Sequence, residues 1–182
     1  MPNFIRLIIA FAILGTAITL MVFGNWGWGV PLVLVAILIA VTFFFNENML
    51  LAQYFLRKDN MDKAKDWLNR INNYESQLVG AQHGYYHLLI GLIESRKAPL
   101  QSEKYFKKAI SLGMTMEHNV ALAKLSLAGI AMAKRNKREA TLYLQEAKKA
   151  DKNKLLADQI KMMKDQMGQM DRTVQQTRSY RR

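Results

Sequence analysis

Apolar residues fill the first quarter of the chain almost without interruption, and charged residues follow in nearly every turn afterwards. The first apolar segment covers residues 4–23, with Arg6 as its one charged residue, and the second covers residues 28–45. A membrane-spanning helix needs roughly 20 apolar residues, and lipid cannot satisfy free backbone groups, so both segments should be helical. The pattern predicts a two-helix transmembrane hairpin in residues 1–46.

The charges that flank the two apolar segments predict an orientation. Arg6 lies near the start of the first segment, Arg57 and Lys58 follow the second, and the turn "GNWGWG" between them has no charge. Positively charged flanks stay in the cytoplasm. We therefore expect an integral membrane protein, of the type found in bacterial inner membranes, with both termini cytoplasmic. The alternative is that the first segment is a cleaved signal peptide, but no A-x-A-like site follows it.

The remainder of the chain contains an internal repeat. Three stretches, "MDKAKDWLNRI", "PLQSEKYFKKAI" and "KREATLYLQEAKKA", align with a spacing of 38 residues. In each stretch a small residue is followed four positions later by a large apolar residue and seven positions later by another apolar one. These positions share one face of a helix, so each stretch should bury one stripe. The nine residues are Ala64, Leu68, Ile71, Ser102, Phe106, Ala109, Ala140, Leu144 and Ala147.

A second helix precedes each of these stretches, over residues 48–57, 84–95 and 120–134. The turn signals "KDN", "RKAP" and "KRNK" separate the members of each pair. The sequence therefore predicts an all-α fold in which the hairpin is followed by three helix pairs, over residues 47–152.

One more helix is predicted over residues 153–170, with an apolar seam along one face. The simpler interpretation of this seam is a capping helix, since the terminal units of stacked repeats need a cap. The alternative is that its methionines bind a partner, because methionine surfaces adapt to varied shapes. Residues 171–182 lack apolar periodicity and are predicted to be a basic disordered tail. The seam consists of Leu156, Ile160, Met163, Met167 and Met170.

These helix pairs resemble the tetratricopeptide repeat family. The second unit matches best, with "LIGLIES" followed by "SEKYFKKAI", and the third offers Leu127–Ala128 before Ala140 and Leu144. The chain departs from the family in its period of 38 residues, against roughly 34 in the family. The terminal proline is missing, and the glycine of the pattern survives only as Gly91. The alternative is an unrelated helical bundle.

The resemblance implies a protein or peptide ligand in a concave groove made by the first helix of each pair. The residues that would line this groove are mostly apolar or small, which suits an apolar helix. The lysine and asparagine clamp by which some family members bind a carboxylate terminus is not evident. The predicted groove residues are Met49, Gln53, His87, Gly91, Leu122, Leu125, Gly129 and Met132.

Charge offers a second class of partner. The chain has 26 Lys and Arg against 14 Asp and Glu, a net charge of +12, and only Arg6 of all these charged residues precedes Glu47. Basic residues near a membrane attract anionic lipid, and they also bind RNA, including that of a ribosome. Here they are spread along the chain, which is typical of a solvated surface.

Residues with catalytic or metal-binding chemistry are few. The chain has no cysteine, which excludes disulfides, thiolate metal sites and cysteine nucleophiles. His83 and His87 are four residues apart, a spacing that can hold a metal, but an ordinary polar pair is the simpler interpretation. Glu94 and Glu103 are expected to be solvated. We therefore expect no enzyme, no cofactor and no small-molecule substrate.

The sequence as a whole predicts a membrane-anchored adaptor or scaffold. Its solenoid would bind protein partners, such as a membrane complex, at the cytoplasmic side of the lipid bilayer. The alternative is a basic membrane receptor that docks a ribosome, RNA or anionic lipid.

Overall fold

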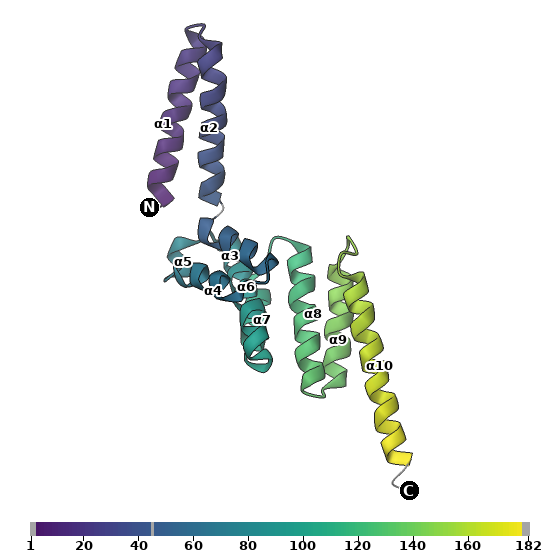
Figure 1. The fold of residues 1–182 in the computed structure, drawn as a ribbon. Coiled ribbons are helices and arrows are strands. Elements are labelled where there is room, and N and C mark those ends of the chain that lie inside the picture. Colours follow the sequence, from purple (N-terminus) through teal and green to yellow (C-terminus); the bar gives the residue numbers. More distant parts are fainter. Residues whose placement is uncertain (1–2, 45, 180–182) are drawn as a thin grey trace. The chain divides into compact units, whose positions relative to one another are not determined.

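The computed structural model describes residues 3–44 and 46–179 (Figure 1). Every regular element within these ranges is a helix and none is a strand, which confirms the all-α prediction. The chain divides into two compact units, Met1–Val79 and Gly80–Arg182. We describe each unit by itself.

The first unit begins with a helical hairpin of α1 (Asn3–Val22) and α2 (Trp26–Phe44). Small residues let the two helices pack together: Ala17 and Ala36 are buried, and a side chain on Gly29 would collide with that of Met21. The turn contains Gly24 at a φ of 81°, a left-handed conformation that glycine adopts without steric cost. The hairpin prediction for this segment is therefore correct as regards its helices.

No helix within residues 3–44 and 46–179 is long and apolar enough to cross a membrane. α1 has 20 residues and α2 has 19, and neither combines the length and the apolar character that a span requires. This finding contradicts the predicted transmembrane hairpin. The prediction of an integral membrane protein with both termini in the cytoplasm is wrong.

Large apolar side chains are exposed on both helices of the hairpin. Exposed apolar side chains in this number often mark a site of association. The exposed residues are Ile8, Ile9, Phe11, Ile18, Val22, Phe23, Trp26, Trp28, Val30, Leu34, Val35, Ile37 and Leu38.

The first unit continues with α3 (Glu47–Arg57), α4 (Met61–Asn69) and the short α5 (Tyr74–Gln77). Each of these helices starts after an asparagine that caps it. The side chain of Asn46 accepts a hydrogen bond of 3.0 Å from the N–H of Asn48, and that of Asn60 accepts one of 3.2 Å from the N–H of Lys63. Such caps satisfy donors that the first turn of a helix leaves free. The sequence pattern did not predict α5.

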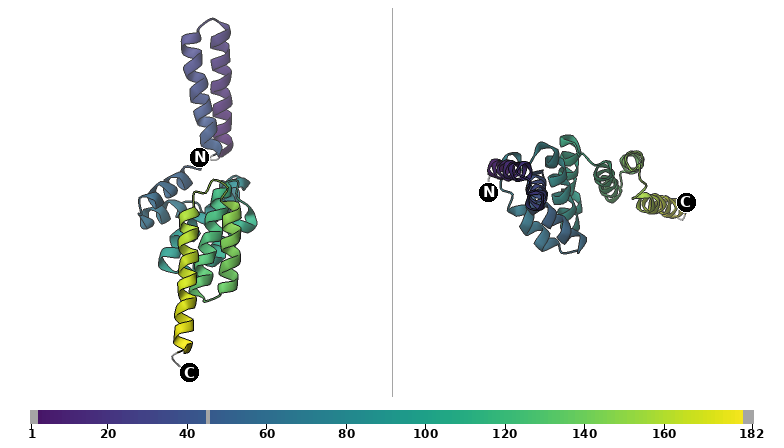
Figure 2. Two further views of the ribbon diagram at one scale, coloured as in Figure 1. Left: turned by 90° about the vertical axis from the view of Figure 1, so that its right-hand side faces the viewer. Right: turned by 90° about the horizontal axis from the view of Figure 1, so that it is seen from above.

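Within residues 80–179, the second unit has five helices that pack in chain order (Figures 1 and 2). The pairs α6–α7 and α8–α9 have the most extensive contacts, α7 packs on α8, and α10 lies along α9 and α8. Two helix pairs and a final helix therefore stand side by side in this unit, whereas the first predicted pair, α3 and α4, belongs to the other unit. Their bounds are α6 Gly80–Lys97, α7 Pro99–Leu112, α8 Glu117–Ala133, α9 Lys137–Ala150 and α10 Ala157–Ser179.

The repeated small–large–small pattern is buried in all three copies. Eight of its nine residues lie in α4, α7 and α9, Ile71 lies just after α4, and none of the nine is more than 7% exposed. The residues that precede the three helices, Asn60, Ala98 and Asn136, are also 38 positions apart. The prediction that each stretch buries one stripe is confirmed.

The turns before α4 and α9 have the same construction. Asp59 and Arg135 adopt left-handed φ values of 57° and 58°. The next residue then donates its N–H back into the preceding helix, from Asn60 to Phe55 at 2.9 Å and from Asn136 to Ala131 at 2.8 Å. This hydrogen bond is typical of a Schellman helix end. The internal repeat is therefore visible in backbone geometry as well as in sequence.

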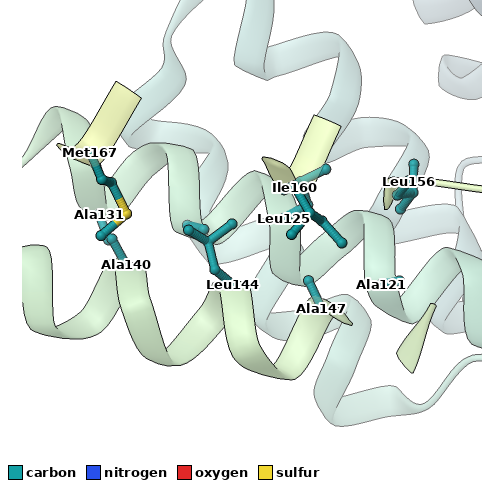
Figure 3. Packing of buried hydrophobic residues seen from close by; sticks show 10 residues of the cluster. Ala121, Leu125, Ala131, Ala140, Leu144, Ala147, Leu156, Ile160 and Met167 are labelled. Atoms are coloured by element: carbon teal, nitrogen blue, oxygen red, sulfur yellow. The ribbon is translucent and has the colours of Figure 1, made fainter. Parts of the chain in front are cut away.

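The last helix is attached by an apolar core shared with α8 and α9 (Figure 3). Met167 lies beside Ala131 and Ala140, and Ile160 lies beside Leu125. Burial of each such large side chain contributes about 1.5–3 kcal/mol. The seam that the sequence identified therefore faces the helix pair before it, as far as Met167; the side chain of Met170 lies outside the described residues.

The backbone of α10 continues to Ser179, where the sequence analysis expected a disordered tail from residue 171. No proline or glycine follows Gly168 within the helix to end it, and glutamine and arginine are good helix formers. Residues 180–182 lie outside the described ranges.

Candidate functional site

Six of the eight residues of the predicted groove occupy matching positions in successive first helices, and the other two, Leu122 and Met132, belong to α8 alone. Met49, His87 and Leu125 are 38 residues apart, and so are Gln53, Gly91 and Gly129. Met49 and Gln53 belong to the first unit, and the other six residues belong to the second. Met49, His87, Gly91 and Leu125 are buried, and the remaining four are partly buried. These positions therefore contribute mainly to packing inside each unit.

Gly91 of α6 makes room for a large neighbour. A Cβ atom at this position would lie 2.8 Å from the ring of Phe106, which is completely buried in α7. The glycine that the resemblance singled out is thus explained by the close approach of the two helices of a pair. It does not open a space for a ligand.

The predicted groove residues of α8 are covered by the final helix. Leu125 is a member of the core that α8, α9 and α10 share, and Leu122 and Met132 pack against that core. A Cβ atom on Gly129 would lie 3.5 Å from the Cε of Met163 in α10. The expectation of an open apolar groove on α8 is therefore corrected: α10 already occupies this face, because its own apolar seam needs burial.

His87 is a neutral core residue. Its side chain is buried, and burial, followed by the charges of Lys108 and His83, lowers its pKa from 6.5 to about 4. Its ring packs edge-on against that of Tyr86, with 5.4 Å between the ring centres. Within the described part of the chain, no group of three or more His, Asp or Glu residues could hold a metal ion.

Glu103 is paired, although the sequence analysis expected it to be solvated. Lys107 on the same helix lies 2.7 Å from its carboxylate, and Lys134 at the end of α8 also binds it. Hydrogen bonds from Lys107 and then Lys134 lower the pKa of Glu103. Because Glu103 is only slightly buried, the pairs add little to stability, but they connect α7 with α8.

An open groove lies between α9 and α10, and the sequence analysis did not find it. It has a volume of about 910 Å³ and will be called the α9–α10 groove. Apolar residues form its floor, and six lysines with one aspartate surround them. The floor contains Leu144, Ala157, Ile160 and Met167, and the lysines are Lys137, Lys148, Lys152, Lys154, Lys161 and Lys164.

The single acidic residue in this groove, Asp151, offsets at most one of the six lysine charges. Asp151 is buried, and its two carboxylate oxygens accept hydrogen bonds from the backbone N–H groups of Leu155 and Leu156, at 3.0 and 2.8 Å. These bonds hold the loop that leads into α10. Of the lysines, Lys152 pairs with Glu117 at the start of α8. The groove as a whole is strongly positive above an apolar floor.

α10 has two acidic residues between its groove-lining positions, Asp158 and Asp165. Neither of them lines the groove.

Comparison with known proteins adds no relative: no family model, no curated protein and no solved structure matches the chain. The functional argument therefore depends on the geometry of the chain itself.

Proposed function

We propose that this protein is a protein-interaction scaffold whose stacked helix pairs bind partner proteins. The observation that supports this proposal most strongly is the stack of α6–α10, which buries its repeated stripe completely and yet leaves the lysine-lined α9–α10 groove open. Stacked helix pairs commonly use such surfaces to bind other proteins. The exposed apolar residues of the hairpin offer a second surface suited to association.

The lining of the α9–α10 groove favours a protein partner over a nucleic acid. Proteins that bind single strands stack the bases on aromatic side chains, and no aromatic residue is among those that line this groove. Apolar floor residues surrounded by charge suit an amphipathic protein segment instead. The RNA or ribosome receptor that the charge of the chain suggested is therefore the weaker candidate.

Site-specific photo-crosslinking in living cells tests the proposal. A photoreactive amino acid replaces exposed residues of the second unit one at a time: Leu100, Leu112, Leu142 and Gln145. We expect discrete protein adducts from some positions and not from others, unchanged by nuclease treatment. Adducts that disappear with nuclease, or an identical smear of products from all four positions, would contradict a protein-binding scaffold.

A further inference from the structure

The internal repeat supplies a matched comparison for the α9–α10 groove. The interface between α7 and α8 is its equivalent one repeat earlier, and that interface is filled by an apolar core. Phe106, Ala123 and Ile130 are buried there, and Ile110 packs against them. The same fold therefore packs this interface tightly when its residues are apolar and of sufficient size.

Thirty-eight residues later, the equivalent positions have different chemistry. Leu144 replaces the larger Phe106, Lys148 replaces Ile110, Lys161 replaces Ala123 and Gly168 replaces Ile130; all four later residues line the groove. Lysine ammonium groups cannot be buried in an apolar interface without a large desolvation cost. These substitutions explain why the second interface stays open and why it is positively charged.

The dimensions and the charge pattern indicate what fits. Along α9 the lining runs from Lys137 to Lys148, and along α10 from Ala157 to Gly168. Each stretch spans eleven steps, or about 17 Å at 1.5 Å per residue, which is about three turns of helix. Lysines stand on both walls and near both ends, so they match a ligand with negative charges spread along its length.

We propose that the α9–α10 groove binds an amphipathic helix of a partner protein, with acidic residues on both sides of an apolar stripe. The stripe lies along the groove floor, over exposed Ala157 and the accessible edges of Leu144, Ile160 and Met167, which are 7%, 9% and 8% exposed, and the acidic residues pair with the surrounding lysines. This assignment rests on the proposed scaffold function and specifies its site and partner class. A second copy of the chain is a poor occupant, because the chain has a net charge of +12.

A binding titration with the full-length protein tests this assignment. The probe is a fluorescein-labelled helical peptide of 14 residues, about 21 Å long, with leucines along one stripe and glutamates on both sides of it. We expect a saturable rise in fluorescence anisotropy with a Kd on the order of 10 µM, which corresponds to about −7 kcal/mol. A peptide with glutamine in place of glutamate should bind at least about tenfold more weakly, a difference of about 1.4 kcal/mol.

Two variants test whether the peptide binds in the groove. Lys148→Glu with Lys161→Glu reverses the charge of both walls and should weaken binding at least about tenfold, or about 1.4 kcal/mol. Gly168→Trp should weaken it similarly by filling the groove, because a Cβ atom at Gly168 has no neighbour within 4 Å and the fold has room for the side chain. Circular dichroism and thermal unfolding check that both variants remain folded.

Matched control variants have the same change in charge or in side-chain size at positions outside the groove. Arg96→Glu with Lys104→Glu alters net charge equally on α6 and α7, and Gly80→Trp adds the same bulk at another glycine with open space around its Cβ. Neither control should change the Kd. Equal weakening by groove and control variants, or no binding below about 1 mM (−4.1 kcal/mol), would overturn the assignment.

Other occupants give different results in the same assay. Displacement of the peptide by a single-stranded RNA at lower concentration would assign the groove to nucleic acid and overturn the proposal. Dimerisation of the chain that Gly168→Trp abolishes would assign the groove to a second copy and overturn the proposal.

Two further outcomes separate the site from the scaffold function. If the peptide does not bind while crosslinking still yields protein adducts from Leu100 or Leu112, the scaffold function stands and only this site is wrong. If the peptide binds but no protein adduct forms in cells, the scaffold function falls.

Discussion

At the residue scale, matching positions in successive repeats have different roles. Gly91 and Gly129 are 38 residues apart, but Gly91 faces the buried ring of Phe106, whereas Gly129 faces the flexible end of Met163. His87 and Leu125 form a second such pair, both buried. The side chains around each position, more than the position itself, therefore determine which residue the fold accepts.

The different surroundings of the two glycines predict different effects of alanine substitution on the free energy of unfolding. Gly91→Ala should lower the free energy of unfolding by about 1–3 kcal/mol, because the added methyl group overpacks a core in which the Phe106 ring cannot move away. Gly129→Ala should leave stability unchanged or raise it by up to about 1 kcal/mol, since alanine favours helix. Urea unfolding followed by circular dichroism measures both. Equal effects of the two substitutions would show that the close contact at Gly91 is not responsible.

His87 predicts a dependence of stability on pH. Its pKa of about 4 in the folded chain lies below 6.5, the ordinary value, so the unfolded chain binds more protons between these pH values. The stability that neutral His87 contributes is present above pH 6.5 and is lost as pH falls towards 4. Each unit of pKa corresponds to about 1.36 kcal/mol, so the loss of stability as pH falls to 4 is on the order of 1–3 kcal/mol.

Urea unfolding between pH 7 and pH 4.5 measures this loss. His87→Leu installs the residue that the next repeat has at this position, and it should make the decline shallower. Lys108 and His83, the charged neighbours that help to lower the pKa, remain in place in the variant. An equally steep decline in the His87→Leu protein would assign the pH dependence to other groups.

At the scale of elements, the junction between α9 and α10 depends on Asp151. Its buried carboxylate accepts both N–H groups that lead into α10. Asp151→Ala leaves these donors without their acceptor, which should cost about 1–3 kcal/mol. Because the loss is local, hydrogen exchange should accelerate in α10 more than in α6 and α7. Asp151→Asn keeps one acceptor oxygen and should show a smaller effect; uniform acceleration over the whole unit would contradict a local role.

Much of the element structure could be predicted from the sequence. The three buried stripes, the pairing of helices and the apolar seam of the last helix all follow from spacings of three and four residues on one face. The short α5 has too few residues to show a period. The end of α10 was misplaced because its final turns lack apolar residues, although nothing in their sequence breaks a helix.

The groove could not be predicted in this way, because it depends on how far two helices separate. The apolar seam that includes Leu156, Ile160 and Met167 predicts a capping helix, or methionines that bind a partner, and it gives no sign of an open groove beside it. The available signal lay in the comparison of repeats: Lys148 and Lys161 stand where the preceding interface has Ile110 and Ala123. Conversely, the sequence predicts that Leu125 lies on the surface of a groove, whereas the structure shows that α10 covers it.

At the scale of the whole molecule, charge and apolar surface are divided along the chain. The hairpin exposes apolar residues on both of its helices, whereas nearly all basic residues follow it. The apolar composition of residues 1–46 predicts a membrane span, but none of the described helices is long and apolar enough for one. Each unit has a surface suited to association with other molecules: the exposed apolar residues of the hairpin in the first unit and the α9–α10 groove in the second. Both surfaces agree with the scaffold proposal.

Reversal of charge on both sides of the α9–α10 groove is the measurement that tests the account most directly. The Lys148→Glu, Lys161→Glu protein is titrated with two helical peptides that share a leucine stripe and differ only in glutamate or lysine beside it. We predict that this variant loses affinity for the glutamate peptide and gains affinity for the lysine peptide, while the Arg96→Glu, Lys104→Glu protein keeps the original preference. If both variants change preference alike, or neither changes, the groove is not the binding site.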